Sequence, residues 1–571
     1  MTTENDGKAT FELNFAIGPA QQFIGAARTT NDFWAGSFVL SWLGGVAMVT
    51  ARKLGAELVF PLGLEKELDE LVNGQFGAID RQAAALPSKF RAVIAQPQAT
   101  GQPDALGLAK AVANAVQTAW HALCAHVYEK DIAPLKADGL DVDRRVLWNQ
   151  QIEEAFDIQW TLSESDRQFE RRKHWRTQNK APQRGSKCML MPQFQELSLQ
   201  STHSAGDEFW KPLITHTGDD LAQGERLCAP ALVKRRMRRW FASLPPTELA
   251  AETQGKWTLT KMDVNYRAPD TAKLSEKNGF YAVLRMDIDG LGGADPESYP
   301  AVSVFAREAN DIVSQHKGYT IYSGGDDVLA FVPAAAALDC AAALRWRWSQ
   351  VQKPTQEQGQ TMLTASVAVL ICHYKSPMAD ALRRSDSLLA DIAKDATGRD
   401  ALAVQLCKPG SDVQTYSAPW DKAWTIDKLH PDTPPKVNLN VFAGTMGKSE
   451  GFSSGYVYWL RSFYNQVNMA RRITPDNDKW TDQMLGLMVT QYLHQQRSGD
   501  GAAITYELAR MQIKPLISLS RQYVRQQESA HKYVSKPKPN DVFTAQAALI
   551  GRFLASMLPE VPKQENREAT V

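Results

Sequence analysis

The sequence has few cysteines and no close pair of them. Six cysteines are spread over 571 residues, at positions 124, 188, 228, 340, 372 and 407. Disulfide-stapled secreted proteins carry denser, paired cysteines, so this spacing excludes a disulfide framework and favours a reducing compartment. We therefore expect a cytoplasmic protein.

The chain also lacks an excess of charge, a membrane-length apolar run and a leader. Lys and Arg total 64 against 63 for Asp and Glu, so any nucleic-acid surface has to be a local patch. No apolar run approaches the roughly 20 residues of a membrane span. The start, MTTENDGKAT, lacks the basic-then-apolar pattern of a signal peptide. We expect no membrane partner.

What the sequence does contain is an acidic hairpin at residues 318–333, GYTIYSGGDDVLAFVP. A β-rich run precedes Gly324-Gly325 and an apolar run follows, and the glycines supply the positive φ that a two-residue hairpin requires. Asp326 and Asp327 then lie at the tip, where two mutually repelling carboxylates suit a divalent cation. A solvated Gly-Asp turn is the alternative.

A second acidic pair ends the strand predicted over residues 280–289, FYAVLRMDID. Asp287 and Asp289 are two positions apart, so their side chains share one face of the strand. This part of the chain follows the order β-α-β-β-α-β, in which the first strand lies beside the hairpin, so the pair can converge with Asp326 and Asp327. Four carboxylates at one edge need one or two Mg²⁺ (or Mn²⁺) ions to stay ionised, and two such ions serve nucleotidyl transfer. Two unrelated exposed turns are the alternative.

Strands and helices also alternate before this region. Strands are predicted at 11–17, 55–61 and 157–162, with a helical run over 20–53 broken near Thr30. This pattern indicates a first α/β domain of about 160 residues. Charged helical runs follow it, and a proline-rich linker leads to a mainly helical C-terminal part.

One helical run, LVKRRMRRWF, is strongly basic. Its five cations cover more than one helical face, so some of them should face water or a partner. We predict a solvated face, with contact to an RNA backbone as the alternative. The five cations are Lys234, Arg235, Arg236, Arg238 and Arg239.

Four stretches together resemble the large CRISPR-associated subunit of type III effector complexes, in its III-B form: IGPAQQFIGAARTTNDFWAGSFVLS, FYAVLRMDIDGLG, YSGGDDVLAF and SVAVLICHYKSPMADALRRSD. The resemblance spans nearly the whole chain. It implies an α+β fold, with two ferredoxin-like palm domains and two mainly helical domains. The implied partition is a first palm at 1–162, a helical middle domain at 163–270, a second palm at 271–416, a linker at 417–436 and a C-terminal helical domain at 437–571.

The resemblance also implies an activity and its site. The second palm of the family makes cyclic oligoadenylates from ATP when its complex binds target RNA, and the first palm is a non-catalytic partner holding a second ATP. The implied partners are the other effector subunits, CRISPR RNA and target RNA. The catalytic residues would be Asp287, Asp326 and Asp327, and these with Asp289 would bind Mg²⁺ or Mn²⁺. The nucleotide contacts would be Gly18, Gly290, Ser323, Gly324, Gly325, Lys394 and Arg399. For Lys394 and Arg399, an exposed helix C-terminus is the alternative, since basic residues are common there.

Two departures from the family pattern stand out. Many relatives begin with an HD nuclease domain, but no His-Asp dipeptide occurs in this chain, so we expect no DNase activity of that type. Relatives also carry two Cys-x-x-Cys pairs in the middle domain. Here SKCMLMPQ and ERLCAPALVKR keep only Cys188 and Cys228, with Met191 and Ala231 at the second positions. Two thiolates are too few for a closed structural zinc site. Completion of the site by His174, His203 or His216 is the alternative, and we expect no zinc.

Three other functions remain open on sequence grounds. A variant enzyme would join ATP to a second small molecule such as S-adenosylmethionine and release a linear conjugate. An inactive scaffold would bind neighbouring subunits and RNA, although it has no need to keep buried carboxylates together. A stand-alone dinucleotide cyclase would not require a second palm and two helical domains.

Overall fold

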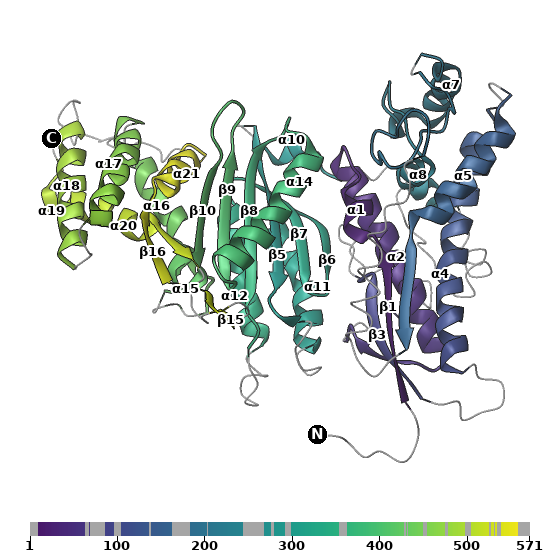
Figure 1. The fold of residues 1–571 in the computed structure, drawn as a ribbon, viewed down its shortest axis with the longest axis horizontal. Helices are drawn as coiled ribbons and strands as arrows, with labels where there is room; N and C mark the ends of the chain where they lie inside the picture. The colour runs from purple at the N-terminus through teal and green to yellow at the C-terminus, as the bar shows by residue number, and fades with distance from the viewer. Residues whose placement is uncertain are drawn as a thin grey trace, which may run out of the picture.

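The structure is a computed structural model, and Figure 1 shows its domains in a row. The second palm lies between the first palm and the C-terminal helices. The structure describes residues 10–62, 68, 86–95, 104–135, 139–162, 183–202, 204–243, 268–275, 279–291, 299–352, 362–427, 430, 432–448, 454–473, 478–496, 504–524, 527–529, 532–533 and 538–557. Gly292 and Gly293, and the histidines at 174 and 203, lie outside these residues.

The first palm is an antiparallel sheet of four strands in the order β2-β3-β1-β4, covered by helices. This is the ferredoxin-like order, so the predicted α+β palm architecture is confirmed for this part. Strand β3 was not predicted from the sequence. The elements are β1 (Thr10–Gly18), α1 (Ala20–Gly25), α2 (Thr30–Lys53), β2 (Glu57–Phe60), β3 (Lys89–Ala95), α4 (Ala105–Val127), η1 (Tyr128–Ile132), α5 (Asp141–Ala155) and β4 (Asp157–Leu162).

Helix α2 is the central helix of this half. It begins with a capping box, in which the Thr29 side chain accepts from the amide of Asp32 and the Asp32 carboxylate accepts from the amide of Thr29. The helix is long and apolar enough to cross a membrane, but 94% of its most apolar window is buried inside the protein. Its hydrophobic length is therefore used for packing against both palms.

The middle domain contributes α7 (Asp207–Thr217), η3 (Gly218–Asp220) and α8 (Ala229–Ser243). Helix α8 is the basic run of the sequence, and the prediction of a solvated face is wrong. Lys234, Arg235, Arg236 and Arg238 are 1–7% exposed, and only Arg239 of the five is half-exposed. The helix packs against α2, α4 and α5, so its cations meet acids and carbonyls from those elements and the neighbouring loops.

The second palm is a six-stranded sheet in the order β10-β9-β8-β5-β7-β6, with β9 parallel to β8 and the other pairs antiparallel. Strands β8-β5-β7-β6 form the ferredoxin-like core that the sequence predicts, and β9 and β10 extend it. The elements are α10 (Thr271–Leu274), β5 (Phe280–Ile288), α11 (Tyr299–Gln315), β6 (Tyr319–Gly324), β7 (Asp327–Pro333), α12 (Ala337–Val351), β8 (Ala365–His373), α14 (Met378–Ser387), η7 (Leu388–Ala396), β9 (Ala401–Cys407) and β10 (Gln414–Pro419).

Each face of this sheet is buried in a different core. Tyr281, Val283 and Phe331 face α14 and the first palm, whereas Ala282 and Leu284 face α11, α12 and the C-terminal domain. The alternation follows the period-2 geometry of strands. The sheet is thus held from both sides, which leaves its hairpin edge to face the first palm.

The C-terminal part is mainly helical with short strands. Its elements are α15 (Trp420–Ala423), β11 (Trp424–Thr425), β12 (Lys436–Val437), α16 (Asn438–Lys448), α17 (Ser454–Ile473), α18 (Asp478–Gln496), α19 (Tyr506–Ile513), α20 (Pro515–Leu519), β13 (Arg521–Val524), β14 (Gln527–Ser529), β15 (Lys532–Tyr533), β16 (Lys538–Phe543) and α21 (Gln546–Ala555). The strands β13 to β16 were not predicted.

Candidate active site between the palms

The acidic hairpin forms as a two-residue turn between β6 and β7. Gly324 pairs with Asp327, so Gly325 and Asp326 are the turn residues. Gly325 has φ of 66°, a conformation that favours glycine, whereas Gly324 ends the strand. Only one of the two glycines therefore supplies the positive φ that the sequence assigned to both.

Three of the four predicted carboxylates gather at this hairpin. Asp287 on β5 lies directly opposite Asp327 in the antiparallel register, and the nearby Asp287 carboxyl is one of the groups that raise the pKa of Asp327. Asp326 follows at the turn and feels the charge of Asp287. The alternation of β5 and the hairpin register thus place Asp287, Asp326 and Asp327 together.

The charge of these carboxylates is poorly compensated. Burial, then the neighbouring charge of Asp287, raises the pKa of Asp326, although Lys89 and Lys394 partly oppose this. Burial, then the charges of Asp326 and Asp287, raises the pKa of Asp327 well above its usual value. The Lys394 ammonium forms an ion pair with Asp287. Arg285 opposes the rise at Asp327, yet the pKa values of both hairpin carboxyls stay above their usual range.

Asp289 has hydrogen-bond partners of its own, although the charge of Lys394 also acts on it. Its carboxylate accepts hydrogen bonds from Thr364 Oγ1 at 2.9 Å, Ser366 Oγ at 2.9 Å and the amide of Asp400 at 3.0 Å. Burial raises its pKa, and these hydrogen bonds oppose the rise. In this structure Asp289 holds the loop before β9 against β5.

That loop has an uncommon backbone. Gly398, Arg399 and Asp400 have φ of 106°, 70° and 44°, and positive φ is rare for the last two residue types in succession. The turn directs the Asp400 amide to Asp289, and the Asp400 carboxylate accepts from Arg345 at 2.6 Å. Arg399 itself is exposed and does not line the cavity described below. Lys394 therefore lies at the carboxylates and Arg399 does not.

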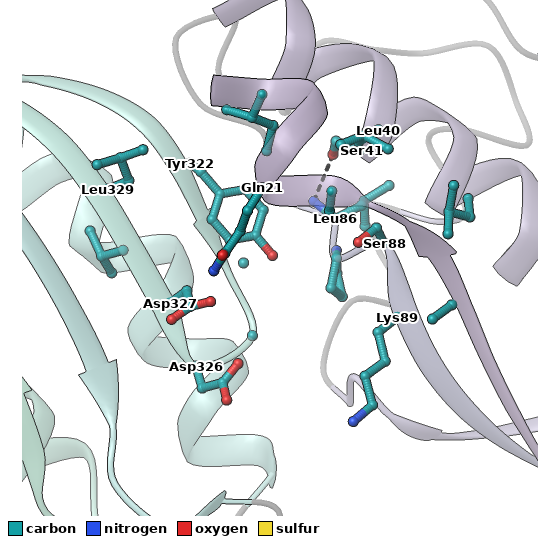
Figure 2. A pocket seen from close by; sticks show the side chains of 18 of the residues that line it. Gln21, Leu40, Ser41, Leu86, Ser88, Lys89, Tyr322, Asp326, Asp327 and Leu329 are labelled. Carbon is teal, nitrogen blue, oxygen red and sulfur yellow. Dashed lines mark hydrogen bonds between the residues drawn. The ribbon is translucent and has the colours of Figure 1, made fainter. Parts of the chain in front are cut away.

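A cavity of about 670 Å³ separates the hairpin from the first palm (Figure 2). Its second-palm wall includes Tyr322, Asp326 and Asp327, and Figure 2 shows Lys89 of β3 on the opposite wall. Because Lys89 lowers the pKa of Asp326, the two side chains interact electrostatically across the gap. The cavity is built by both palms.

The predicted glycines lie at or beside this cavity. Gly324 and Gly325 line it, and Gly18 lies between two lining residues, Ile17 and Pro19. A Cβ added at Gly290 would meet no atom within 4 Å, so space is open beside the end of β5. A ligand could approach the backbone closely at Gly290, whereas the ring of Tyr322 already fills the space beside Gly324.

Ser323 does not contact the cavity, and a β-bulge is the reason. The register of β6 shifts between Thr320 and Tyr322, which turns Tyr322 to the cavity and Ser323 to the opposite face. The Ser323 hydroxyl donates to the carbonyl of Ala306 on α11 at 2.7 Å. Sequence alternation alone places these two side chains the other way round.

Several lining residues were missed from the sequence. Lys89 was missed because β3 was not predicted, although Pro87 followed by KFRAVIA is a strand signal. Arg285 and Gln21 also line the cavity. Arg285 shares the cavity face of β5 with Asp287, so the alternation that located the aspartates also locates it.

The carboxylates fit a hard divalent cation. The donor atoms are oxygens, which Mg²⁺ and Mn²⁺ prefer, and their raised pKa values mark uncompensated negative charge. In the part of the chain that the structure describes, no three His, Cys, Asp or Glu side chains are spaced as a ready metal cage. Mg²⁺ usually takes one or two protein carboxylates and completes its shell with water and substrate phosphates, and Asp326 and Asp327 could supply these carboxylates.

The two cysteines of the predicted degenerate zinc site meet in the middle domain. Cys188 and Cys228 are buried, and each thiol alters the pKa of the other, which places them close together; Met191 and Ala231 are buried too. Among the described residues no third metal ligand completes a group there.

The antiparallel palm sheet with carboxylates on its central hairpin defines the class of this protein, a palm-domain protein of the kind that nucleotidyl cyclases and polymerases share. Residues 280–403 match the family described as Cas10/Cmr2, second palm domain, and residues 13–125 match the family described as CRISPR-associated protein Cmr2, N-terminal. The stretches matched by these two family models lie in the second and the first palm, so each palm of this chain is similar to a domain of Cas10/Cmr2 proteins.

Individual relatives agree with this assignment. The chain is 35% identical over 117 residues to the CRISPR system Cmr subunit Cmr2 of Pyrococcus furiosus, a match that covers 20% of this chain and 13% of that protein. A type III-B Cmr-beta structure in the apo state aligns with a TM-score of 0.62 at 13% identity, over 97% of this chain and 82% of the other. The same complex bound to cognate target RNA aligns with a TM-score of 0.58, also at 13% identity, over 97% and 83%. The structural matches show a shared fold across nearly the whole chain.

Proposed function

We propose that this protein is a nucleotidyltransferase that makes cyclic oligoadenylate from ATP, as the large subunit of a type III-B RNA-guided antiviral complex. The observation that carries the proposal is that Asp326 and Asp327 line a cavity built by both palms, with Asp287 paired to Asp327 on the neighbouring strand. Its partners would be the other effector subunits, CRISPR RNA and target RNA.

Each residue has a role that its position supports. Asp287, Asp326 and Asp327 would hold Mg²⁺ or Mn²⁺, which activates the attacking ribose hydroxyl and neutralises the triphosphate leaving group. Lys394, now paired with Asp287, is within reach of a phosphate that displaces this contact. Gly325 forms the turn that presents the two carboxylates, and Tyr322 packs beside Gly324 on the cavity side. Asp289 fixes the loop that follows Lys394 and does not touch the ligand.

The first palm would supply the opposite half of the site. Lys89 faces the acidic hairpin from β3, and Gln21 enters the cavity from α1. A second ATP on this wall would place its ribose hydroxyl toward the hairpin, and proximity of two bound nucleotides is itself a large part of catalysis. Binding of target RNA would act by shifting the two palms toward the competent arrangement.

The test uses the assembled complex with target RNA, ATP and Mg²⁺, with the product read by mass spectrometry. We expect cyclic oligoadenylate from the native complex and none after Asp326→Asn with Asp327→Asn. Asp391→Asn is the matched control, because this exposed carboxylate lies three residues from Lys394 on η7. A linear adenylate conjugate would instead identify the variant chemistry, and the absence of any nucleotide product would identify a scaffold.

A further inference from the structure

Lys234 is a buried cation whose partners are all backbone carbonyls of one short segment. Its ammonium donates to the carbonyl of Phe23 at 2.7 Å, to that of Ala26 at 2.9 Å and to that of Ile24 at 3.5 Å. These carbonyls end helix α1, where no further helical amide is available to them. A lysine has three N–H donors, so Lys234 closes the end of α1 with its full donor set.

The next residue of α8 holds the start of α2. Arg235 donates to Asp32 at 3.0 Å, and Asp32 also accepts from the amides of Arg28 and Thr29 at 2.9 and 3.2 Å. Lys234 and Arg235 therefore hold the two ends of the link between α1 and α2. Both side chains belong to the middle domain and both are buried.

Helix α2 leaves a path for this lysine. A Cβ added at Gly36 would lie 3.0 Å from both Cε and Nζ of Lys234 and 3.1 Å from the Cα of Ile24. These distances are tighter than ordinary carbon contacts, so any larger residue crowds the lysine and α1 together. Gly36 is thus matched to the position of Lys234.

The segment that Lys234 holds is a wall of the candidate site. Gln21, Gln22 and Gly25 of α1 line the cavity between the palms. The same three residues line a smaller cavity of about 350 Å³ on the side of the middle domain, together with Leu190 and Gln193. Helix α1 therefore separates the nucleotide cavity from a space at the middle domain, and it has only six residues to fix its own position.

We infer that Lys234 is a positioning residue for the candidate nucleotide site: by binding the last carbonyls of α1 it fixes the first-palm wall of the cavity, and it makes the middle domain part of that site. That the ligand of this site is a nucleotide rests on the proposed function, whereas the role of Lys234 in fixing helix α1 does not.

The test compares three variants in the full complex. Lys234→Met removes the donors and keeps a linear apolar chain, Lys234→Arg restores donors, and Arg239→Met removes a half-exposed cation of the same helix that pairs with Asp220 and does not touch α1. Hydrogen exchange of the amides of residues 20–29 measures directly how firmly helix α1, the first-palm wall of the cavity, is held. We expect faster exchange there in Lys234→Met, partial recovery in Lys234→Arg and no change in Arg239→Met.

Kinetics then separate positioning from general structure. With ATP as substrate, KM should rise about tenfold in Lys234→Met, because a displaced wall weakens nucleotide placement. The kcat should change less, since the carboxylates belong to the other palm. Arg239→Met should leave both constants unchanged.

The pH profile gives an independent reading. Burial lowers the pKa of Lys234 to about 8, and the charged or titratable groups that face it are Asp32, Arg235, Cys188 and Cys228. The ammonium therefore loses its proton at mildly alkaline pH, and KM in the native protein should rise between about pH 7 and 9. Lys234→Arg should lack this rise, because a guanidinium keeps its proton.

Unchanged exchange at residues 20–29 in a folded Lys234→Met complex would overturn the inference, and so would faster exchange with an unchanged KM. If Lys234→Met does not assemble, Gly36→Ala decides, since it crowds the same contact without removing a charge. Faster exchange at residues 20–29 in Gly36→Ala supports the role of Lys234 in fixing α1, and unchanged exchange there refutes it. A complex with no nucleotide product at all would refute the proposed function, while the exchange result would still stand.

Discussion

Asp326 and Asp327 hold like charges side by side on a half-buried hairpin, and this placement opposes folding. The folded state raises the pKa of both groups, so it binds more protons than the unfolded chain above the ordinary carboxyl pKa of 3.8. Stability from these groups therefore falls as pH rises through the raised pKa. A divalent cation reverses the penalty by binding the ionised pair.

Replacing one of them should stabilise the protein without metal. We expect Asp327→Asn to raise the free energy of unfolding by roughly 0.5–2 kcal/mol at neutral pH in a chelator, the range typical of relieving strain at an active site. The gain should shrink as pH falls toward 4, where the native carboxyls are protonated. Urea unfolding across pH measures it, and a less stable variant would contradict the assigned charge state.

The same variant should lose its response to metal. Mg²⁺ should raise the unfolding midpoint of the native protein, because a ligand that binds only the folded state stabilises it. It should leave Asp327→Asn nearly unchanged. Asp391→Asn should respond as the native protein does.

At the scale of single elements, helix α8 shows that long-range partners decide where a charged helix lies. Arg236 donates twice to Asp131 at 2.7 Å and once to Asp220 at 2.6 Å, and all three side chains are buried. These acids stand 105 and 16 positions away in the sequence. A basic run is ordinarily solvated, and no local pattern reveals distant acids that neutralise it.

Breaking one such pair should be severe. Arg236→Met should lower the free energy of unfolding by about 3–5 kcal/mol, because buried Asp131 loses its guanidinium partner and Asp220 keeps only Arg238 and Arg239. Arg239→Met, on the same helix but half-exposed, should cost about 1 kcal/mol or less. Denaturant titration of both variants measures the contrast, and equal effects would mean that burial does not set the value of these pairs.

At the hairpin, the positions of the aspartates could be predicted from the sequence, but the faces of the β6 side chains could not. Period-2 alternation along β5 and the paired glycines sufficed to locate Asp287, Asp326 and Asp327. The bulge between Thr320 and Tyr322 exchanges the faces on which Tyr322 and Ser323 lie. Strand alternation in the sequence does not reveal such a bulge. Lys89 and the α1 wall come from another domain, so only the assembled fold brings them to the site.

Ser323 provides a direct check of that reversal. Ser323→Ala removes the hydrogen bond to Ala306 and should lower the free energy of unfolding by about 0.5–1.5 kcal/mol. Its KM for ATP should stay unchanged. Tyr322→Ala, on the cavity face, should raise KM. A raised KM in Ser323→Ala with unaltered stability would restore the serine as a nucleotide contact.

At the scale of the whole molecule, the two palms are one unit because α2 packs on both. The hydroxyl of Ser37 donates to the carbonyl of Ile321 on β6 at 2.7 Å, and the rings of Phe33 and Phe331 meet edge to face at 5.9 Å. Phe60 of β2 comes within contact distance of the hairpin, since a Cβ at Gly325 would lie 3.4 Å from it. The acidic hairpin is therefore positioned against the first palm.

Lys89 tests whether the chemistry of the hairpin depends on the first palm. Its positive charge lowers the pKa of Asp326 from across the cavity, so Lys89→Met should raise that pKa further. Fewer carboxylates are then ionised at mildly acidic pH, and the acidic limb of the Mg²⁺-dependent activity should move to higher pH. We expect kcat/KM at neutral pH to fall about tenfold, a loss of ~1.4 kcal/mol. Lys89→Arg should recover most of the activity, and Lys110→Met, an exposed lysine on α4, should behave as the native protein. An unshifted acidic limb in Lys89→Met would show that the hairpin works without the charge of the first palm.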